Sequence, residues 1–157
     1  MIQRIQTIWL FLASAVIFAL FLFPYFQFID ASGLGHALKV NGAFGTENGQ
    51  PTRTETFWLQ MIATVLIGLF PLYIIFQFKN RKLQRNLIWV EILAIILLGV
   101  WFNFNATAAL NEYALTFSAN NLGVGFFMLP IAIILLFMAS AAIKKDEKLI
   151  KSADRLR

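Results

Sequence analysis

Cysteine is absent from this 157-residue chain, histidine occurs once, and charged residues make up only 13% of it. The lack of cysteine excludes disulfides, thiol nucleophiles, iron–sulfur ligands and CxxC motifs. His36 alone cannot supply a four-ligand zinc site or a bis-histidine haem, and we expect it to be a solvated loop residue. No GxGxxG, Walker A, HExxH or GxSxG pattern occurs either. We therefore predict no cofactor and no enzymatic activity.

Hydrophobic residues are what the chain has in excess. They form 59% of it, 15% of the residues are aromatic, and the mean hydropathy is +0.72. A soluble domain is about 45–50% apolar and about a quarter charged, and a domain of this size leaves much of its surface in water. The composition predicts an integral membrane protein, and it excludes disorder, fibrous structure and a typical cytosolic enzyme.

Four apolar segments have the length of a membrane-spanning helix, which needs about 20 residues. They cover about residues 5–26, 57–78, 87–105 and 123–143, and polar or charged residues flank each of them. The first is too long for the apolar core of a signal peptide, so we interpret it as an uncleaved helix. The predicted fold class is an all-α membrane protein, with one domain over residues 1–157 that forms a bundle of four transmembrane helices.

Basic residues are distributed unevenly among the connections. Eleven of the thirteen Lys and Arg residues fall near the N-terminus, in residues 79–85 and in the tail 144–157, whereas Lys39 and Arg53 stand on the other side. Because cytoplasmic loops carry the excess of basic residues, both termini are predicted to be cytoplasmic. The net charge of +5 is then a topology signal that also suits anionic lipid headgroups. It is not evidence for nucleic-acid binding.

The first outer connection is rich in glycine and polar residues. Residues 37–40 followed by Asn41-Gly42 predict a small β-hairpin with a type I′ turn. The hairpin must pack on the helix ends, because an isolated hairpin is marginal in water. We expect a flexible loop over residues 46–56, and a short interfacial helix over residues 110–117 in the second outer connection.

The tail of residues 144–157 is short and strongly charged. Apolar residues recur near one helical face, and Glu147 stands four residues before Lys151, so the fourth helix is predicted to continue as an amphipathic cytoplasmic extension. One interpretation of the tail is an anchor with lipid contact. Another is a docking helix for a membrane or cytoplasmic partner. The candidate docking residues are Lys144, Lys145, Lys148, Lys151, Arg155 and Arg157.

Glu91 is the one ionisable residue inside a predicted span. A carboxylate at the centre of a membrane helix costs about 2.5–3.5 kcal/mol on insertion scales, so it suggests a functional role in ion or proton handling. Glu91 lies only about one turn inside its segment, however. A structural ion pair with Arg85, or with Arg4 on the first segment, is the alternative.

The two ends of the chain resemble a known family. The first ten residues, MIQRIQTIWL, and the last fifteen, IKKDEKLIKSADRLR, are similar to a family of small bacterial four-span proteins classed as a domain of unknown function. The resemblance covers the whole chain. It implies a multi-pass protein of the bacterial inner (cytoplasmic) membrane, and it supplies no activity.

Two functions remain open on the sequence. The first is a non-catalytic subunit, assembly factor or scaffold of a membrane complex, in contact with the lipid bilayer and with a membrane-protein partner or a second copy of itself. The second is a small oligomeric transporter or channel that uses Glu91, with helix kinks at Pro71 and Pro130 as its moving parts. A lipid- or quinone-handling enzyme is disfavoured, because the sequence offers no acid–base pair or metal set.

Overall fold

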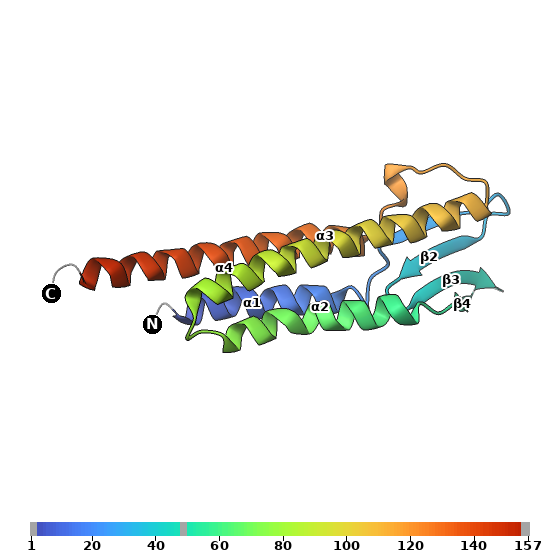
Figure 1. Cartoon of the computed structure of the whole chain (residues 1–157). Helices are drawn as coiled ribbons and strands as arrows, with labels where there is room; N and C mark the ends of the chain where they lie inside the picture. The colour runs from blue at the N-terminus through green and yellow to red at the C-terminus, as the bar shows by residue number, and fades with distance from the viewer. Residues whose placement is uncertain (1–2, 48–49, 155–157) are drawn as a thin grey trace.

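The computed structural model describes residues 3–47 and 50–154, with side chains over residues 5–46 and 50–149. In this part of the chain, four α-helices lie side by side along their length, and a small β-sheet stands at one end of them (Figure 1). The helices are α1 (Gln3–Ala19), α2 (Trp58–Phe76), α3 (Arg81–Glu112) and α4 (Val124–Asp154). We call the end with the strands the sheet end. The opposite end, with residues 79–85 and 144–148, is the basic end.

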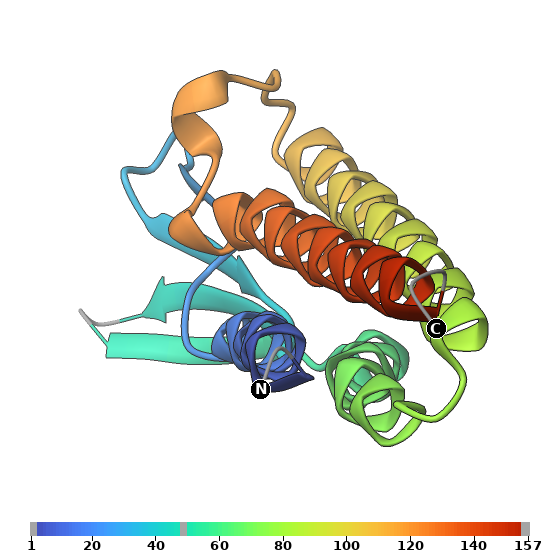
Figure 2. The ribbon, with the colours of Figure 1, turned by 90° about the vertical axis from the view of Figure 1, so that its left-hand side faces the viewer.

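Each helix packs against two neighbours: α1 contacts α4 and α2, and α3 contacts the same two helices from the other side (Figure 2). The buried residues of α3 recur at helical spacing, as in Ile88, Ile95, Phe102 and Leu110, so one stripe of the helix faces the interior. Small residues allow close approach elsewhere. Gly68 on α2 meets the ring of Phe18, where an added β-carbon would lie 3.0 Å from Cζ.

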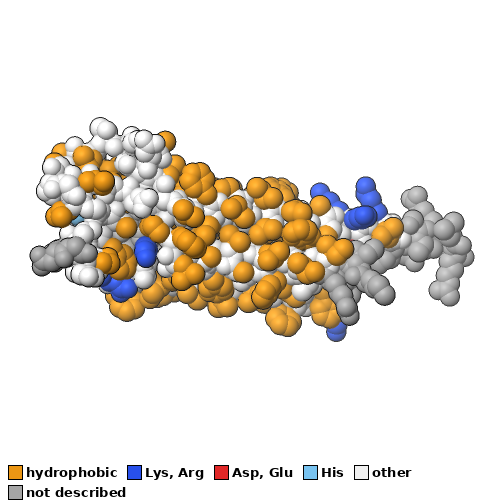
Figure 3. Space-filling model, turned by 180° about the vertical axis from the view of Figure 1, so that it is seen from behind, with side chains coloured by type: hydrophobic (Ala, Val, Ile, Leu, Met, Phe, Trp, Pro, Cys, Tyr) orange, Lys and Arg blue, Asp and Glu red, His pale blue; other side chains and the backbone are white. Residues whose placement is uncertain are grey.

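The outward faces of the helices are apolar as well. Large side chains such as Leu66, Phe76, Leu97 and Phe104 are more than half exposed, and hydrophobic atoms cover the length of the helices in Figure 3, with Lys and Arg near both ends. Within the described residues, three helical stretches are long and apolar enough to cross a membrane. They are Trp58–Phe76, Arg81–Glu112 and Val124–Leu149.

The first apolar segment is shorter as a helix than the predicted span of residues 5–26. α1 ends at Ala19, and the N–H groups of residues 20–22 bond three residues back, which tightens the final turn. Pro24 prevents the helix from continuing, because proline disfavours the helical conformation of the residue before it. Apolar composition alone could not show this early end.

The other helices differ from the predicted segments mainly at their polar ends. α2 agrees with residues 57–78, whereas α3 extends well beyond both ends of residues 87–105. The separate interfacial helix predicted over residues 110–117 is wrong, because α3 runs through Glu112 and the chain then turns at Ala114, whose φ is 53°. The predicted continuation of the fourth helix beyond residue 143 is confirmed.

A four-stranded antiparallel sheet, rather than a lone hairpin, forms between α1 and α2 in the described residues. Its strands follow chain order: β1 (Phe26–Ile29), β2 (Gly35–Lys39), β3 (Gly42–Glu47) and β4 (Gln50–Glu55). The all-α fold class is corrected accordingly. The predicted flexible loop over residues 46–56 is also wrong, because backbone pairing with β3 orders β4.

The predicted hairpin is present, as the β2–β3 pair, but its turn differs. Lys39 pairs with Gly42, so Val40 and Asn41 form the two-residue connection. Neither has a positive φ, which a type I′ turn requires at both central positions. Gly42 carries the unusual backbone instead, with φ of 150°. A β-carbon there would lie 2.0 Å from the Glu55 carbonyl oxygen, so the close approach of β4 demands glycine.

The sheet is fixed to the helices through the first turn of α4. Gly123 N–H donates to the Tyr25 carbonyl over 3.0 Å, and Gly125 N–H donates to Pro24 over 2.9 Å. An isolated bridge also pairs Phe26 with Leu122. The glycines at positions 123 and 125 therefore permit close packing of the helix end against residues 24 and 25.

Candidate functional site

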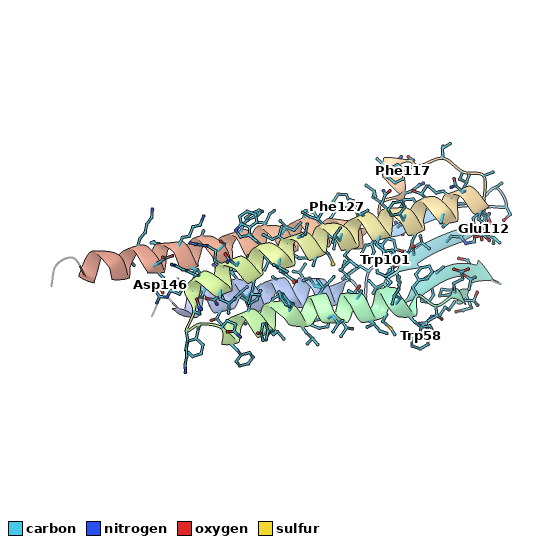
Figure 4. All side chains as sticks on the ribbon, in the orientation of Figure 1. Trp58, Trp101, Glu112, Phe117, Phe127 and Asp146 are labelled. Carbon is cyan, nitrogen blue, oxygen red and sulfur yellow. The ribbon has the colours of Figure 1, made fainter. Side chains whose placement is uncertain are left out.

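Two ion pairs join α3 to α4 at the basic end. Arg81 Nη2 lies 2.8 Å from Asp146 Oδ2, and Arg85 Nη1 lies 3.4 Å from Glu147 Oε2. Asp146 is only 8% exposed, and Figure 4 shows it on α4 beside the start of α3. The first contact is an attraction of opposite charges without well-aligned hydrogen-bond geometry. Two acidic residues of the tail thus hold the two helices together.

The predicted docking residues of the tail are only partly described. Lys144, Lys145 and Lys148 are exposed on α4. Lys151 also belongs to α4, but its side chain lies outside the described residues, as do Arg155 and Arg157. The Glu147–Lys151 pair therefore cannot be compared with the sequence prediction. Lys144 and Lys148 line a hollow of about 410 Å³ between α4 and α3, and Lys145 does not line it.

Glu91 lies on the interior face of α3 and is 1% exposed. Its Oε1 has no hydrogen-bond partner among the described residues. Arg85, one predicted partner, contacts Glu147 instead. The side chain of Arg4, the other, lies outside the described part of the chain. Two turns nearer the basic end, Gln84 Nε2 donates to the Ile74 carbonyl over 3.2 Å, whereas Gln84 Oε1, like Glu91 Oε1, has no hydrogen-bond partner among the described residues.

Other polar side chains inside the helices link pairs of them. Ser14 Oγ on α1 donates to the Gly68 carbonyl on α2 over 2.6 Å. Near the sheet end, Asn105 Nδ2 on α3 donates to Gln60 Oε1 on α2. Tyr25 stacks on the ring of Phe102, with centroids 4.2 Å apart. The two hydrogen bonds join α2 to α1 and to α3, and helix–helix hydrogen bonds of this kind fix helix register.

His36 is not the solvated loop residue that the sequence suggested. It lies in β2 with its side chain 14% exposed, and its Nε2 is 3.1 Å from Asp30 Oδ2. Its ring stacks on Phe28, the cross-strand partner in β1, with centroids 5.0 Å apart. The ring of Tyr113, just past the end of α3, lies 4.6 Å away. The pairing of β1 with β2 and the approach of the end of α3 together create this cluster, so no local sequence signal could reveal it.

Asp30 organises the connection between β1 and β2. Its Oδ1 accepts from the Ser32 hydroxyl over 2.5 Å and from the N–H groups of Ser32 and Leu34 over 2.8 and 2.9 Å. These donors, first the Ser32 hydroxyl, and the neighbouring His36 hold the pKa of the Asp30 carboxyl well below its usual range. The carboxylate is therefore a fixed negative charge at the sheet end.

Two hollows flank the sheet, and His36 and Phe44 line both of them. One, of about 660 Å³, lies against β1, β2 and β3 beside Asn120 and Asn121. The other, of about 430 Å³, lies between the sheet and the end of α3 and includes Glu55, Glu112 and Tyr113. Partial loss of water and the nearby carboxylates, Glu112 foremost, raise the pKa of Tyr113. The described residues contain no group of three or more His, Asp or Glu side chains placed to hold a metal ion.

The described chain is thus a helical protein of four long segments that carries a small antiparallel sheet at one end. It belongs to the family described as "Domain of unknown function (DUF4293)", whose model matches residues 2–156. The resemblance of the two chain ends to a family of unknown function is confirmed. No curated protein matches the chain.

Proposed function

We propose that the chain is a multi-pass protein of the bacterial inner membrane, with the sheet end outside and the basic end in the cytoplasm. The support is the apolar outer surface of the helices, which water would not tolerate at this extent, together with the cations at one end. The chain has no native cysteine. Gln50→Cys on β4 should therefore react with an impermeant thiol reagent from outside, and Lys145→Cys only from the cytoplasm.

We further propose that the protein acts as a non-catalytic subunit, assembly factor or scaffold of a membrane complex. One observation carries this: an ordered sheet is attached to the start of α4 by the Gly123–Tyr25 and Gly125–Pro24 hydrogen bonds. Ordering some thirty residues outside the helices costs conformational entropy. A preformed surface needs little further ordering when it binds a partner, so less conformational entropy is lost on binding.

The hollows on both sides of Phe44 mark the face where such a partner would dock. Lys39 Nζ and the Arg53 guanidinium each lie 5.4 Å from the ring centre, so an aromatic anchor sits between two cations. Apolar anchors of this kind contribute disproportionately to binding.

The test is the mass of the native particle extracted in mild detergent. We expect a complex larger than the 17.8 kDa chain, which Phe44→Ala dissociates. Gln50→Ala is the control, because Gln50 is exposed on the same sheet and lines neither hollow. A lone monomer in the wild type, or equal behaviour of the two variants, would refute the scaffold role.

The second candidate function is a small oligomeric transporter or channel that uses Glu91. Its specific support is the buried Oε1 of Glu91, which has no partner among the described residues. Buried carboxylates inside membrane helices commonly serve ion or proton pathways. Purified protein in liposomes should then show a flux that Glu91→Gln abolishes. No flux above that of empty liposomes would rule this function out.

A further inference from the structure

The outward side of α3 and α4 carries two hollows, one basic and one apolar. The basic hollow at the basic end is the one of about 410 Å³, lined by Lys82, Arg85, Lys144, Glu147 and Lys148. The apolar hollow, of about 390 Å³, lies between residues 95–103 of α3 and residues 126–133 of α4. Apart from Asn103, all of its lining side chains are apolar or absent, as at Gly99.

The two hollows lie on the same side of α3 and α4, and we call them, together with the surface between them, the α3–α4 groove. Residues seven apart lie two turns along a helix and within about 20° of the same line. Such lines run through both hollows: Lys82, Trp89, Ile96 and Asn103 on α3, and Lys144, Phe137 and Pro130 on α4. Between the hollows, the rings of Trp89 and Phe137 meet edge to face, with centroids 5.6 Å apart. Both rings are about half exposed, so they form part of the outward surface between the two hollows.

The basic hollow has an excess of positive charge. Four cations face one carboxylate, Glu147, which orients Arg85 over 3.4 Å. Lys82, Lys144 and Lys148 form no ion pair with any described residue. A guanidinium and several ammonium groups around one space suit a phosphate group. Basic hollows between membrane helices at the cytoplasmic surface are suited to anionic lipid headgroups.

The distance between the hollows fits one lipid molecule. Ten residues separate Arg85 from Ile95, which is about 15 Å along a helix at 1.5 Å per residue. Half of a hydrocarbon core about 30 Å thick is the same length. Acyl chains of a lipid whose phosphate sits among the lysines would therefore pass over Trp89 and Phe137 and end in the apolar hollow.

We propose that the α3–α4 groove is a binding site for an anionic phospholipid of the leaflet at the basic end. The phosphate is held by Lys82, Arg85, Lys144 and Lys148, and the chains lie along the groove. This inference rests on the proposed membrane location. It adds a ligand class and a site that the general positive charge of the tail does not specify.

Trp89 provides the readout, because it lies on the path of the chains. Wild-type protein is reconstituted in phosphatidylcholine vesicles with a fixed fraction of phosphatidylglycerol, and the acyl chains of one lipid or the other are brominated. The Trp89 signal is the difference from Trp89→Phe. We expect brominated phosphatidylglycerol to quench it more strongly than brominated phosphatidylcholine at equal fraction.

Two double variants each remove two positive charges, one pair from inside the basic hollow and the other pair from outside it. Lys144→Gln with Lys148→Gln should lower the relative association constant for phosphatidylglycerol by about tenfold or more, since one cation near an anionic surface contributes about a factor of five. Lys79→Gln with Lys145→Gln should leave it unchanged, because neither residue lines the hollow. Equal quenching by both lipids in the wild type, or equal loss in both double variants, would overturn the site.

Two controls remain. One distinguishes a lipid from free phosphate as the ligand, and the other tests the membrane location. Excess inorganic phosphate should not abolish the preference beyond the effect of sodium chloride at equal ionic strength. If it does, the hollow binds free phosphate and the lipid assignment is wrong. Alkaline extraction of the vesicles tests the membrane location by itself. Release of the protein would refute the proposed location, whereas retention without lipid preference would refute only the groove.

Discussion

A β-carbon at Gly123 would lie 2.2 Å from the carbonyl oxygen of Pro24. The other nearest atoms are also backbone, at 2.9 Å in Pro24 and 3.1 Å in Tyr25, so no side chain can rotate away to make room. The same glycine donates its N–H to the Tyr25 carbonyl. The joint between the sheet and α4 therefore depends on the missing side chain at this position.

Gly123→Ala should lower the free energy of unfolding by about 1–3 kcal/mol, the usual cost of overpacking a tight site. Thermal unfolding in detergent measures it. Gly99→Ala is the matched control, because its β-carbon would meet only the flexible Cδ1 of Leu129 at 3.3 Å, and alanine favours a helix by about 1 kcal/mol over glycine. Equal destabilisation by the two variants would argue against the tight joint.

Removal of Arg81 should lower the free energy of unfolding more than removal of Arg85 does. Arg81→Gln leaves the nearly buried Asp146 without its cation, and unpaired buried polar groups cost about 1–3 kcal/mol. Arg85→Gln breaks a longer and more exposed contact, for which we expect less than about 1 kcal/mol. Unfolding free energies of the two variants decide this. In Asp146→Asn protein the effect of Arg81→Gln should largely vanish, and an undiminished effect would contradict the pairing.

Glu91→Leu should raise the free energy of unfolding by about 1–3 kcal/mol. The reason is that the wild-type protein buries a carboxylate whose Oε1 has no described partner, and a leucine removes that penalty. Glu112→Leu, at an exposed position of the same helix, should change stability by less than about 0.5 kcal/mol. A loss of stability in Glu91→Leu would show that the carboxylate has a stabilising partner.

The stability of the sheet end should decrease in acid because of Asp30. Its pKa is lower in the folded protein than its ordinary value of 3.8, so the folded state prefers the ionised form. The resulting stabilisation is complete above about pH 4 and is lost as the pH falls toward the lower folded value. Asp30→Asn should therefore melt at a lower temperature than the wild type at pH 7.

The pH dependence of this difference is the sharper measurement. The gap between the wild type and Asp30→Asn should shrink as the pH falls below about 4, because protonation removes the same charge from the wild type. Near-ultraviolet circular dichroism of the aromatic cluster around His36 and Tyr113 would follow the sheet end during melting. A gap that stays constant down to about pH 2.5 would refute the role of the Asp30 charge.

The helices were predictable because their signal is local. Long apolar runs identify them, and the distribution of Lys and Arg separates the connections of one end from those of the other. The residues at which the helices begin and end were less predictable. Pro24 stops α1 early, and α3 extends past its apolar stretch in both directions, because polar residues continue a helix when they can face water or pair.

The same distinction holds for the site residues: some features are visible in the sequence, and others depend on how the helices pack. Glu91 stood out in the sequence because a carboxylate inside an apolar run is conspicuous, but its lack of a described partner depends on what surrounds it. Proximity along the chain makes Arg85 a candidate partner of Glu91, whereas the structure pairs it with Glu147, more than sixty residues away. Contacts of that range depend on how the helices pack.

By itself, the sequence determined where the apolar helices lie, which end of the protein is basic, and to which family the chain belongs. Those properties follow from composition and spacing over a few turns of chain. Only the tertiary structure decided that β4 is ordered, that His36 is enclosed by Phe28, Asp30 and Tyr113, and that α3 and α4 line one basic hollow. Each of these requires residues far apart in the chain to meet, and the entropy of closing such loops is repaid only by the packing of the whole fold.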